Sequence, residues 1–285
     1  MISRFQPQSD PAELAVSFER DGLLIVEDAV PAADCDALAA RAHALIDAWD
    51  PEEGRTVFST TSPRHAADAY FRDSGDKIRV FLEDGAVDED GALAVDRHAA
   101  VNKLGHAMHD LDPVFERVSR GPVLAGLAAA LGIRDPKLVQ SMVIWKPPAI
   151  GGAVVPHQDA TFLVTDPPSV VGFWLALEDA DETNGCLLAI PGGHKGPLRQ
   201  TFLDRNGVLT MDTLDDTPFD TAAFRPLPAR KGTVVVLHGL LPHGSAANTS
   251  ERSRMAYTLH VVDGMARWHP DNWIRRRPDD PFRGF

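Results

Sequence analysis

Cysteine is scarce in this sequence, because the 285 residues include only Cys35 and Cys186. Two cysteines can form one disulfide at most, so a small scaffold stabilised by several disulfides is excluded. The lack of a thiol cluster also argues against a structural zinc site and an iron–sulfur cluster. Cys35 falls in a helical pattern and Cys186 follows the turn Asn184-Gly185, so both are expected to be small buried hydrophobic residues.

Positive charge and long hydrophobic runs are also lacking. The 28 Lys and Arg residues against 41 Asp and Glu residues give a formal net charge of −13, whereas a nucleic-acid-binding protein normally presents a basic face. No run approaches the roughly 18 to 20 apolar residues of a membrane span, and residues 1–7 lack the apolar centre of a signal peptide. We therefore expect a cytoplasmic protein with no nucleic-acid or membrane partner, and no obligate protein partner is evident.

The predicted elements separate a helical first part from a β-rich second part. Apolar residues at helical spacing predict helices over residues 10–20, 32–49, 102–111 and 123–131, and short strands are predicted at 23–26 and 77–82. Apolar runs between turn formers predict the strands of the second part, at residues 138–145, 152–159, 170–177, 186–190, 232–238 and 254–262.

This order predicts a single domain over residues 1–285, with helical support over about 1–135, a β-core over about 136–265 and a C-terminal extension over about 266–285. The spacing of the strands suits an antiparallel sandwich or barrel with helices packed on it better than alternating βαβ units. Residues 50–76 are polar and broken. The mostly polar residues 195–228 interrupt the series of strands, and an insertion of that length is usually functional or mobile.

Two residues that can ligate a metal stand two positions apart near the end of a predicted strand, in His157-Gln158-Asp159. Residues i and i+2 of an extended chain point to the same side, so the imidazole and the carboxylate can face one point. His243 follows another predicted strand and could complete a set of two histidines and one carboxylate. Such a set leaves three positions of an octahedral metal open, as in non-haem Fe(II) oxygenases. A His-x-Asp pair alone is common in a chain with 11 histidines, so the pattern needs further support.

Arg254 supplies that support, because it begins an apolar run a short distance after His243. A buried guanidinium beside a metal can hold a carboxylate through two hydrogen bonds. Arg252 is the competing residue, but it ends a polar turn and is expected to be solvated.

Together these residues resemble the pattern of the phytanoyl-CoA dioxygenase family of Fe(II)/2-oxoglutarate oxygenases: His157-x-Asp159, then His243 with Ser245 two positions on, then Arg254. Six stretches in the same order extend the resemblance over nearly the whole chain: residues 74–79, 102–107, 140–142, 156–160, 182–186 and 252–257. The resemblance implies a mainly β fold with flanking helices, in which a double-stranded β-helix (a cupin-like jelly roll) forms the core and the N-terminal helices pack on it.

The resemblance also implies roles for individual residues. His157, Asp159 and His243 would bind Fe(II). Arg254, helped by Ser245, would pair with the distal carboxylate of the co-substrate 2-oxoglutarate.

Three further residues, Lys103, Met142 and Trp174, would line the co-substrate site of this family. Lys103 would add a second cation for a dianion, although it is also explained as a solvated helix residue. Met142 and Trp174 are equally explained as core residues of apolar strands.

The remaining histidines are interpreted without a ligand role. His194 follows a strand in the turn Pro-Gly-Gly-His, and the family that the chain resembles has a similar turn, so the resemblance implies a turn or a substrate-side role. His238 and His260 lie on predicted strands as core or pocket residues. His106 and His109 lie three positions apart on a predicted helix, with no third ligand near in sequence.

The function that the resemblance implies is hydroxylation of a C–H bond in a small organic substrate, with use of dioxygen and decarboxylation of 2-oxoglutarate to succinate. Asp159 favours hydroxylation, because related halogenases lack the carboxylate ligand. The net charge of −13 disfavours a CoA thioester as substrate, although the basic patch Arg275-Arg276-Arg277 could serve one.

Two other functions stay open. The chain could bind iron and 2-oxoglutarate as a sensor or scaffold without productive turnover. It could also be a metal-dependent isomerase or hydrolase of the cupin type, which would need additional histidines near His157 and no carboxylate clamp.

Overall fold

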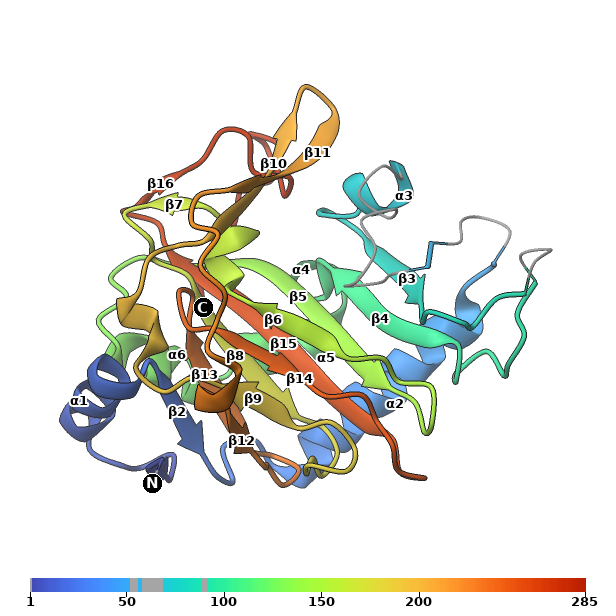
Figure 1. Cartoon of the computed structure of the whole chain (residues 1–285), viewed down its shortest axis with the longest axis horizontal. Helices are drawn as coiled ribbons and strands as arrows, with labels where there is room; N and C mark the ends of the chain where they lie inside the picture. Colours follow the sequence, from blue (N-terminus) through green and yellow to red (C-terminus); the bar gives the residue numbers. More distant parts are fainter. Residues whose placement is uncertain (1, 52–55, 58–68, 89–91) are drawn as a thin grey trace.

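The computed structural model describes residues 2–51, 56–57, 69–88 and 92–285 (Figure 1). Much of the polar stretch 50–76 lies outside the described residues. The described part is mainly β, with one sheet of eight strands, one of four strands and two of two strands. No described helix is long and apolar enough to cross a membrane.

The large sheet contains strands from both halves of the chain. All neighbouring strands in it are antiparallel except β1 and β2, which are parallel. Its order is β1 (Arg4–Phe5), β2 (Leu23–Val26), β13 (Val234–His238), β8 (Val171–Ala176), β15 (Arg254–Asp263), β5 (Pro136–Lys146), β4 (Val101–His106) and β3 (Ile78–Leu82).

The small sheet faces the large one and is antiparallel throughout. Its order is β12 (Arg225–Leu227), β9 (Leu187–Ala189), β14 (His243–Ser245) and β6 (Val154–His157). Side chains from both sheets meet in one apolar cluster that includes Trp174, Leu187, Leu227, Val235 and Ala256. The interior of the β-core therefore lies between the two sheets.

Alternation along the strands decides which face each residue covers. In β13, Val235 and Leu237 join the cluster between the sheets, whereas Val234 and Val236 join the cluster on the other face of the large sheet. That outer cluster includes residues of the helices α1 (Pro11–Asp21), α2 (Ala32–Ala48), α5 (Pro113–Ser119) and α6 (Pro122–Ala130). Because the large sheet is covered on both faces, its central strands β13 and β8 are mostly apolar on both faces.

Local signals explain the positions of the helices. The carboxylate of Asp10 accepts a hydrogen bond from the amide of Ala12 at 2.9 Å, and Pro11 opens the helix, as at a typical N-terminus. Gly22 ends α1 in the left-handed conformation, with φ 72°. The predicted helices 10–20, 32–49 and 123–131 agree with α1, α2 and α6 to within one or two residues.

The helix predicted over residues 102–111 is wrong for most of its length. Residues 101–106 form the strand β4 between β3 and β5, and only Met108–Leu111 (α4) is helical. An inner strand buried on both faces lacks the alternation of a half-exposed strand, so its apolar residues also fit helical spacing. Lys103 is accordingly a buried strand residue and not the solvated helix residue that the pattern allowed.

The polar stretch 195–228 is more ordered than its composition suggests. It holds the hairpin of β10 (Gln200–Arg205) and β11 (Val208–Thr213), and it ends with β12 in the small sheet (Figure 1). Asn206 and Gly207 form the turn of the hairpin, with φ 58° and 89°. Two consecutive positive φ values are what an Asn-Gly hairpin turn requires, so this dipeptide is the signal that the composition obscured.

The C-terminal residues 266–285 are tied back to the body of the protein. Strand β16 (Arg267–Trp268) pairs with β7 (Thr165–Asp166), and the Trp273 ring stacks on Phe71 with centroids 4.9 Å apart. Asp110 accepts from three arginines, Arg120 at 2.7 Å, Arg276 at 3.0 Å and Arg283 at 2.8 Å. Two of those arginines belong to the C-terminal segment, so Asp110 anchors it.

Replacing this anchor is expected to destabilise the fold in a pH-dependent way. Burial alone would raise the pKa of Asp110, but His109, Arg120 and Arg276 lower the pKa below its ordinary value. The stabilisation is therefore present above the unfolded pKa near 4 and is lost as the pH falls further. We expect Asp110→Asn to reduce the free energy of unfolding by about 3 kcal/mol at pH 7 and by clearly less at pH 3, as measured by urea denaturation.

A suitable control is Asp279→Asn, because Asp279 pairs with Arg277 at 3.5 Å on the exposed surface. Its effect should stay below about 0.5 kcal/mol. Equal losses of stability for Asp110→Asn at pH 7 and pH 3 would contradict the ionic role of Asp110.

Candidate metal centre and co-substrate pocket

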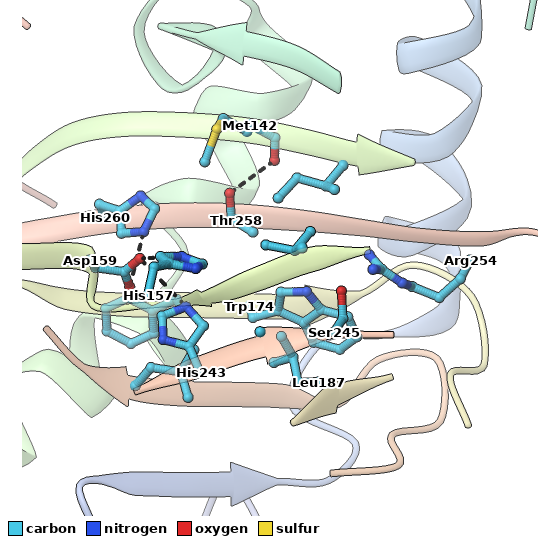
Figure 2. A pocket seen from close by; sticks show the side chains of 16 residues that line it. Met142, His157, Asp159, Trp174, Leu187, His243, Ser245, Arg254, Thr258 and His260 are labelled. Carbon is cyan, nitrogen blue, oxygen red and sulfur yellow. Dashed lines mark hydrogen bonds and ion pairs between the residues drawn. The ribbon is translucent and has the colours of Figure 1, made fainter. Parts of the chain in front are cut away.

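The three predicted ligands meet because two strands of the small sheet pair at the ends that carry the histidines. Strand β6 ends at His157, and β14 begins at His243, which is the antiparallel partner of His157. Gln158 continues the extended chain with φ −117° and ψ 133°, and Asp159 opens the 3₁₀ helix η2 (Asp159–Thr161). The carboxylate therefore turns back toward the two imidazoles (Figure 2).

The geometry of these three side chains suits one metal ion. The Nε2 atoms of His157 and His243 each lie 3.6 Å from Oδ1 of Asp159, and the two imidazole centroids are 4.3 Å apart. In the described part of the chain, this is the one group of three or more His, Cys, Asp or Glu residues whose ligand atoms all lie within 4.8 Å of one another. Two imidazoles and one carboxylate are a donor set that fits Fe(II).

Backbone carbonyls orient both imidazoles. Nδ1 of His157 donates to the carbonyl of Val155, and Nδ1 of His243 donates to the carbonyl of Leu241, each at 2.9 Å. Because the proton is on Nδ1, the lone pair of Nε2 in each imidazole is free and points to the place between the three ligands where a metal ion would bind.

The ionisation of two of the three residues, His243 and Asp159, is consistent with metal binding. Burial lowers the pKa of His243 to about 4, which keeps its imidazole neutral at pH 7. For Asp159, burial alone would raise the pKa, but the imidazoles of His260 and His243 outweigh it, and the pKa lies well below its ordinary value. A neutral imidazole and an ionised carboxylate are the forms that bind metals.

A pocket between the two sheets runs from this group to Arg254 (Figure 2). The large sheet contributes Met142, Trp174 and Thr258 to the lining, and the small sheet contributes Leu187 and Ser245. Its wall is thus mostly apolar between two polar ends, which is a common construction for a small-molecule site.

Arg254 is a buried cation at the end of the pocket away from the histidines. Its Nε donates to the carbonyl of Gly185 at 3.1 Å, and its guanidinium lies 5.7 Å from the centre of the Trp174 ring. Its Nη1 has no hydrogen-bond partner, and no carboxylate lies within ion-pairing distance, among the described residues. Burial lowers the pKa of Arg254 to about 10, so it remains charged at pH 7. A buried arginine with an unused donor is suited to an anionic ligand.

The other expected co-substrate residues divide into two groups. Met142, Trp174 and Ser245 line the pocket with Arg254. Lys103 is absent from the lining, and its ammonium lies 5.4 Å and 5.5 Å from the centres of two phenylalanine rings, Phe71 and Phe81. Burial lowers the pKa of Lys103 well below its ordinary value.

Arg252, the competitor of Arg254, is exposed and pairs with Asp181 at 2.6 Å, as expected. The structure does not bring His106, His109, His194 or His238 into the group of three ligands. His106 and His109 contact Ser74 and Ser141, while His194 and His238 contact each other.

The sequence predicts His260 as a core or pocket residue on a strand, but it does not predict the contact of His260 with Asp159. Its Nε2 lies 3.3 Å from Oδ2 of Asp159. Arg254, Thr258 and His260 all line the pocket from one face of β15. The even spacing from Arg254 to His260 along a predicted strand is the signal that could have found it.

The two facing sheets, with the histidine-aspartate group at one end of the pocket and the arginine at the other, form a double-stranded β-helix of the kind found in Fe/2-oxoglutarate oxygenases. The epimerase SnoN from nogalamycin biosynthesis, in complex with Fe³⁺, alpha ketoglutarate and nogalamycin RO, has a similar fold, with a TM-score of 0.66 at 19% identity over 96% of this chain and 95% of that one. EctD from S. alaskensis, with 2-oxoglutarate and 5-hydroxyectoine, gives a TM-score of 0.64 at 20% identity over 95% and 86%.

The sequence comparison defines the family. The Phytanoyl-CoA dioxygenase (PhyH) family matches residues 18–256, and the chain belongs to this family. It is 41% identical over 282 residues to phytanoyl-CoA dioxygenase domain-containing protein 1 of Bos taurus, covering 95% of this chain and 97% of that protein. The fold class and the family predicted from the resemblance are confirmed.

Metal binding is expected to depend on a glycine under the carboxylate. A Cβ atom at Gly172 would lie 2.8 Å from Oδ2 of Asp159, closer than carbon and oxygen can approach without a shift. Gly172→Ala should displace the carboxylate and weaken Fe(II) or Co(II) binding by on the order of 10- to 100-fold, the usual effect of disturbing a ligand's surroundings. Isothermal titration with the purified apoprotein measures the affinity.

Gly126→Ala is the matched control, since a Cβ there meets no atom within 4 Å. Wild-type metal affinity in Gly172→Ala would show that the carboxylate does not rest on this strand when the metal binds.

Proposed function

We propose that this protein is an Fe(II)- and 2-oxoglutarate-dependent dioxygenase that hydroxylates a C–H bond of a small organic substrate. The observation that carries the proposal is the pairing of two sites in one pocket, a group of metal ligands at one end and a buried arginine without a counterion among the described residues at the other. A ligand with a metal-chelating end and a distal carboxylate is the natural occupant of such a pocket, and 2-oxoglutarate has both.

The protein's own residues would divide the work. His157, Asp159 and His243 would hold Fe(II) on one side and leave the other side open. Arg254, with Ser245 near it, would hold the distal carboxylate. When bound, iron and 2-oxoglutarate supply the oxidative chemistry with dioxygen, in which 2-oxoglutarate is decarboxylated to succinate and the substrate is oxidised.

The pocket wall supports the same arrangement. Met142 and Trp174 would flank the chain of 2-oxoglutarate and keep water from the arginine end. Lys103 would act from outside this wall, because its ammonium lies among aromatic rings and not in the lining. The lining of the pocket therefore supports direct contacts of 2-oxoglutarate with Arg254 and Ser245 and not with Lys103.

The surface charges favour a substrate that is not a CoA thioester. Each arginine of the basic patch 275–277 already faces a carboxylate: Arg275 lies 3.3 Å from Asp204, Arg276 lies 3.0 Å from Asp110 and Arg277 lies 3.5 Å from Asp279. A patch neutralised in this way offers little attraction to the phosphates of CoA.

The first test is succinate formation from 2-oxoglutarate with Fe(II) and oxygen, measured in the wild type and in Asp159→Ala and Arg254→Ala. We expect Asp159→Ala to abolish turnover, because a ligand is lost. Arg254→Ala should raise the KM for 2-oxoglutarate by about 10- to 100-fold, since a charge-assisted hydrogen bond typically contributes 1.5 to 3 kcal/mol. Arg252→Ala is the control and should match the wild type, because Arg252 is exposed and pairs with Asp181.

The other outcomes separate the alternatives. Failure of the wild type to bind Fe(II) would exclude the metal site. Binding of Fe(II) and 2-oxoglutarate without succinate formation, across a panel of candidate substrates, would favour the sensor. Substrate conversion that does not need 2-oxoglutarate would favour an isomerase or hydrolase of the cupin type.

A further inference from the structure

The two oxygens of the Asp159 carboxylate have different surroundings. Oδ1 lies 3.6 Å from the Nε2 atoms of both His157 and His243, so it is the oxygen that belongs to the ligand group. Oδ2 lies on the other side, 3.3 Å from Nε2 of His260 (Figure 2). From this geometry we infer that His260 is a positioning residue, which holds Oδ2 and makes Asp159 bind the metal through one oxygen only. The inference rests on the proposed function.

His260 is not itself a ligand in this arrangement. It is a residue of β15 in the large sheet, and its side chain is outside the group whose donor atoms all lie within 4.8 Å of one another. Its contact is with the carboxylate and not with the point that the three ligand atoms share. His260 therefore acts on the metal through Asp159.

The surroundings of His260 decide which nitrogen carries the proton. Nδ1 is buried and has no hydrogen-bond partner among the described residues. A proton on Nδ1 alone would leave a buried donor unsatisfied and would direct the lone pair of Nε2 at a carboxylate oxygen. Both are unfavourable, so Nε2 is the nitrogen that carries the proton, and its N–H faces Oδ2 of Asp159.

The backbone of β8 at Gly172 and the ring of His260 enclose Oδ2 in a narrow slot. Gly172 is the antiparallel partner of His260, and a Cβ there would lie 2.8 Å from Oδ2 and 3.5 Å from Cδ2 of the His260 ring. The carboxylate thus rests on a glycine and has an imidazole beside it. The slot holds Oδ2 away from the two imidazoles of the ligand group.

Holding one oxygen has a consequence for the number of open metal positions. Two imidazoles and one carboxylate oxygen leave three positions of an octahedral ion free, whereas a carboxylate that binds through both oxygens leaves two. A co-substrate that chelated the metal would use two positions, and dioxygen would need the third. By holding Oδ2, His260 would keep that third position available.

The experiment counts the open coordination positions of a bound metal ion when neither co-substrate nor substrate is present. In the Mn(II)-loaded protein, line broadening of the electron paramagnetic resonance spectrum in ¹⁷O-enriched water reports the number of water ligands. We expect three water ligands in the wild type and two in His260→Leu, because the freed Oδ2 can then bind the metal. His260→Gln should restore three, since its side-chain amide places a donor near the position of Nε2.

Turnover provides a second measurement. His260→Leu should lower kcat for succinate formation by on the order of 10- to 100-fold, while the KM for 2-oxoglutarate changes only a few-fold, because the arginine end of the pocket is untouched. The control is His109→Leu, which removes a buried imidazole that contacts Ser141 and lies outside the pocket. It should keep three water ligands and the wild-type kcat.

The comparison of His260→Gln with His260→Asn keeps the test informative if the leucine variant does not fold. Both are polar amides, but the asparagine side chain is one methylene shorter and should not reach Oδ2. Three water ligands and equal kcat values in His260→Asn, His260→Gln and the wild type would overturn the inference. A wild type that binds neither Mn(II) nor Fe(II) would instead contradict the proposed function.

Discussion

The pairing of β14 with β6 is the interaction on which the candidate site depends. It places His243 directly opposite His157, and a shift of one residue would point one of the two imidazoles to the other face of the small sheet. The side chain of Gln158 reinforces this register, because its amide donates to the carbonyls of Pro197 and Leu240 at 3.0 Å and 2.8 Å. The segment that carries Asp159 is thus tied to the loop that leads into His243.

Strand β15 gives the pocket its second end. Arg254 and His260 lie on the same face of this one strand, so the arginine and the contact to Asp159 are held at a constant separation by a central strand of the large sheet. The alternate residues of the same strand, among them Tyr257, pack under the helices on the opposite face, where the Tyr257 hydroxyl lies 2.6 Å from that of Ser119. One strand therefore anchors the helical layer and positions both ends of the site.

Some features were readable from local sequence because their physical cause is local. The N-terminus of α1 follows from Asp10 and Pro11, and the strands of the second half follow from short apolar runs between turn formers. The strand β4 was not readable in this way, because an inner strand loses the alternation that identifies a half-exposed one. The hairpin at Asn206-Gly207 did carry a local signal, but the polar composition around it obscured that signal.

The sequence by itself determined which chemical groups are present and how they lie along their own strands: His157 and Asp159 two positions apart, Ser245 two positions after His243, and Arg254 at the start of an apolar run. Only the tertiary structure decided that these segments meet, that Arg254 is buried without a counterion among the described residues, and that His260 contacts the outer oxygen of Asp159. The reason is physical. The direction of a side chain within a strand follows from the period of two, whereas the distance between strands follows from register and sheet packing, which long-range contacts set.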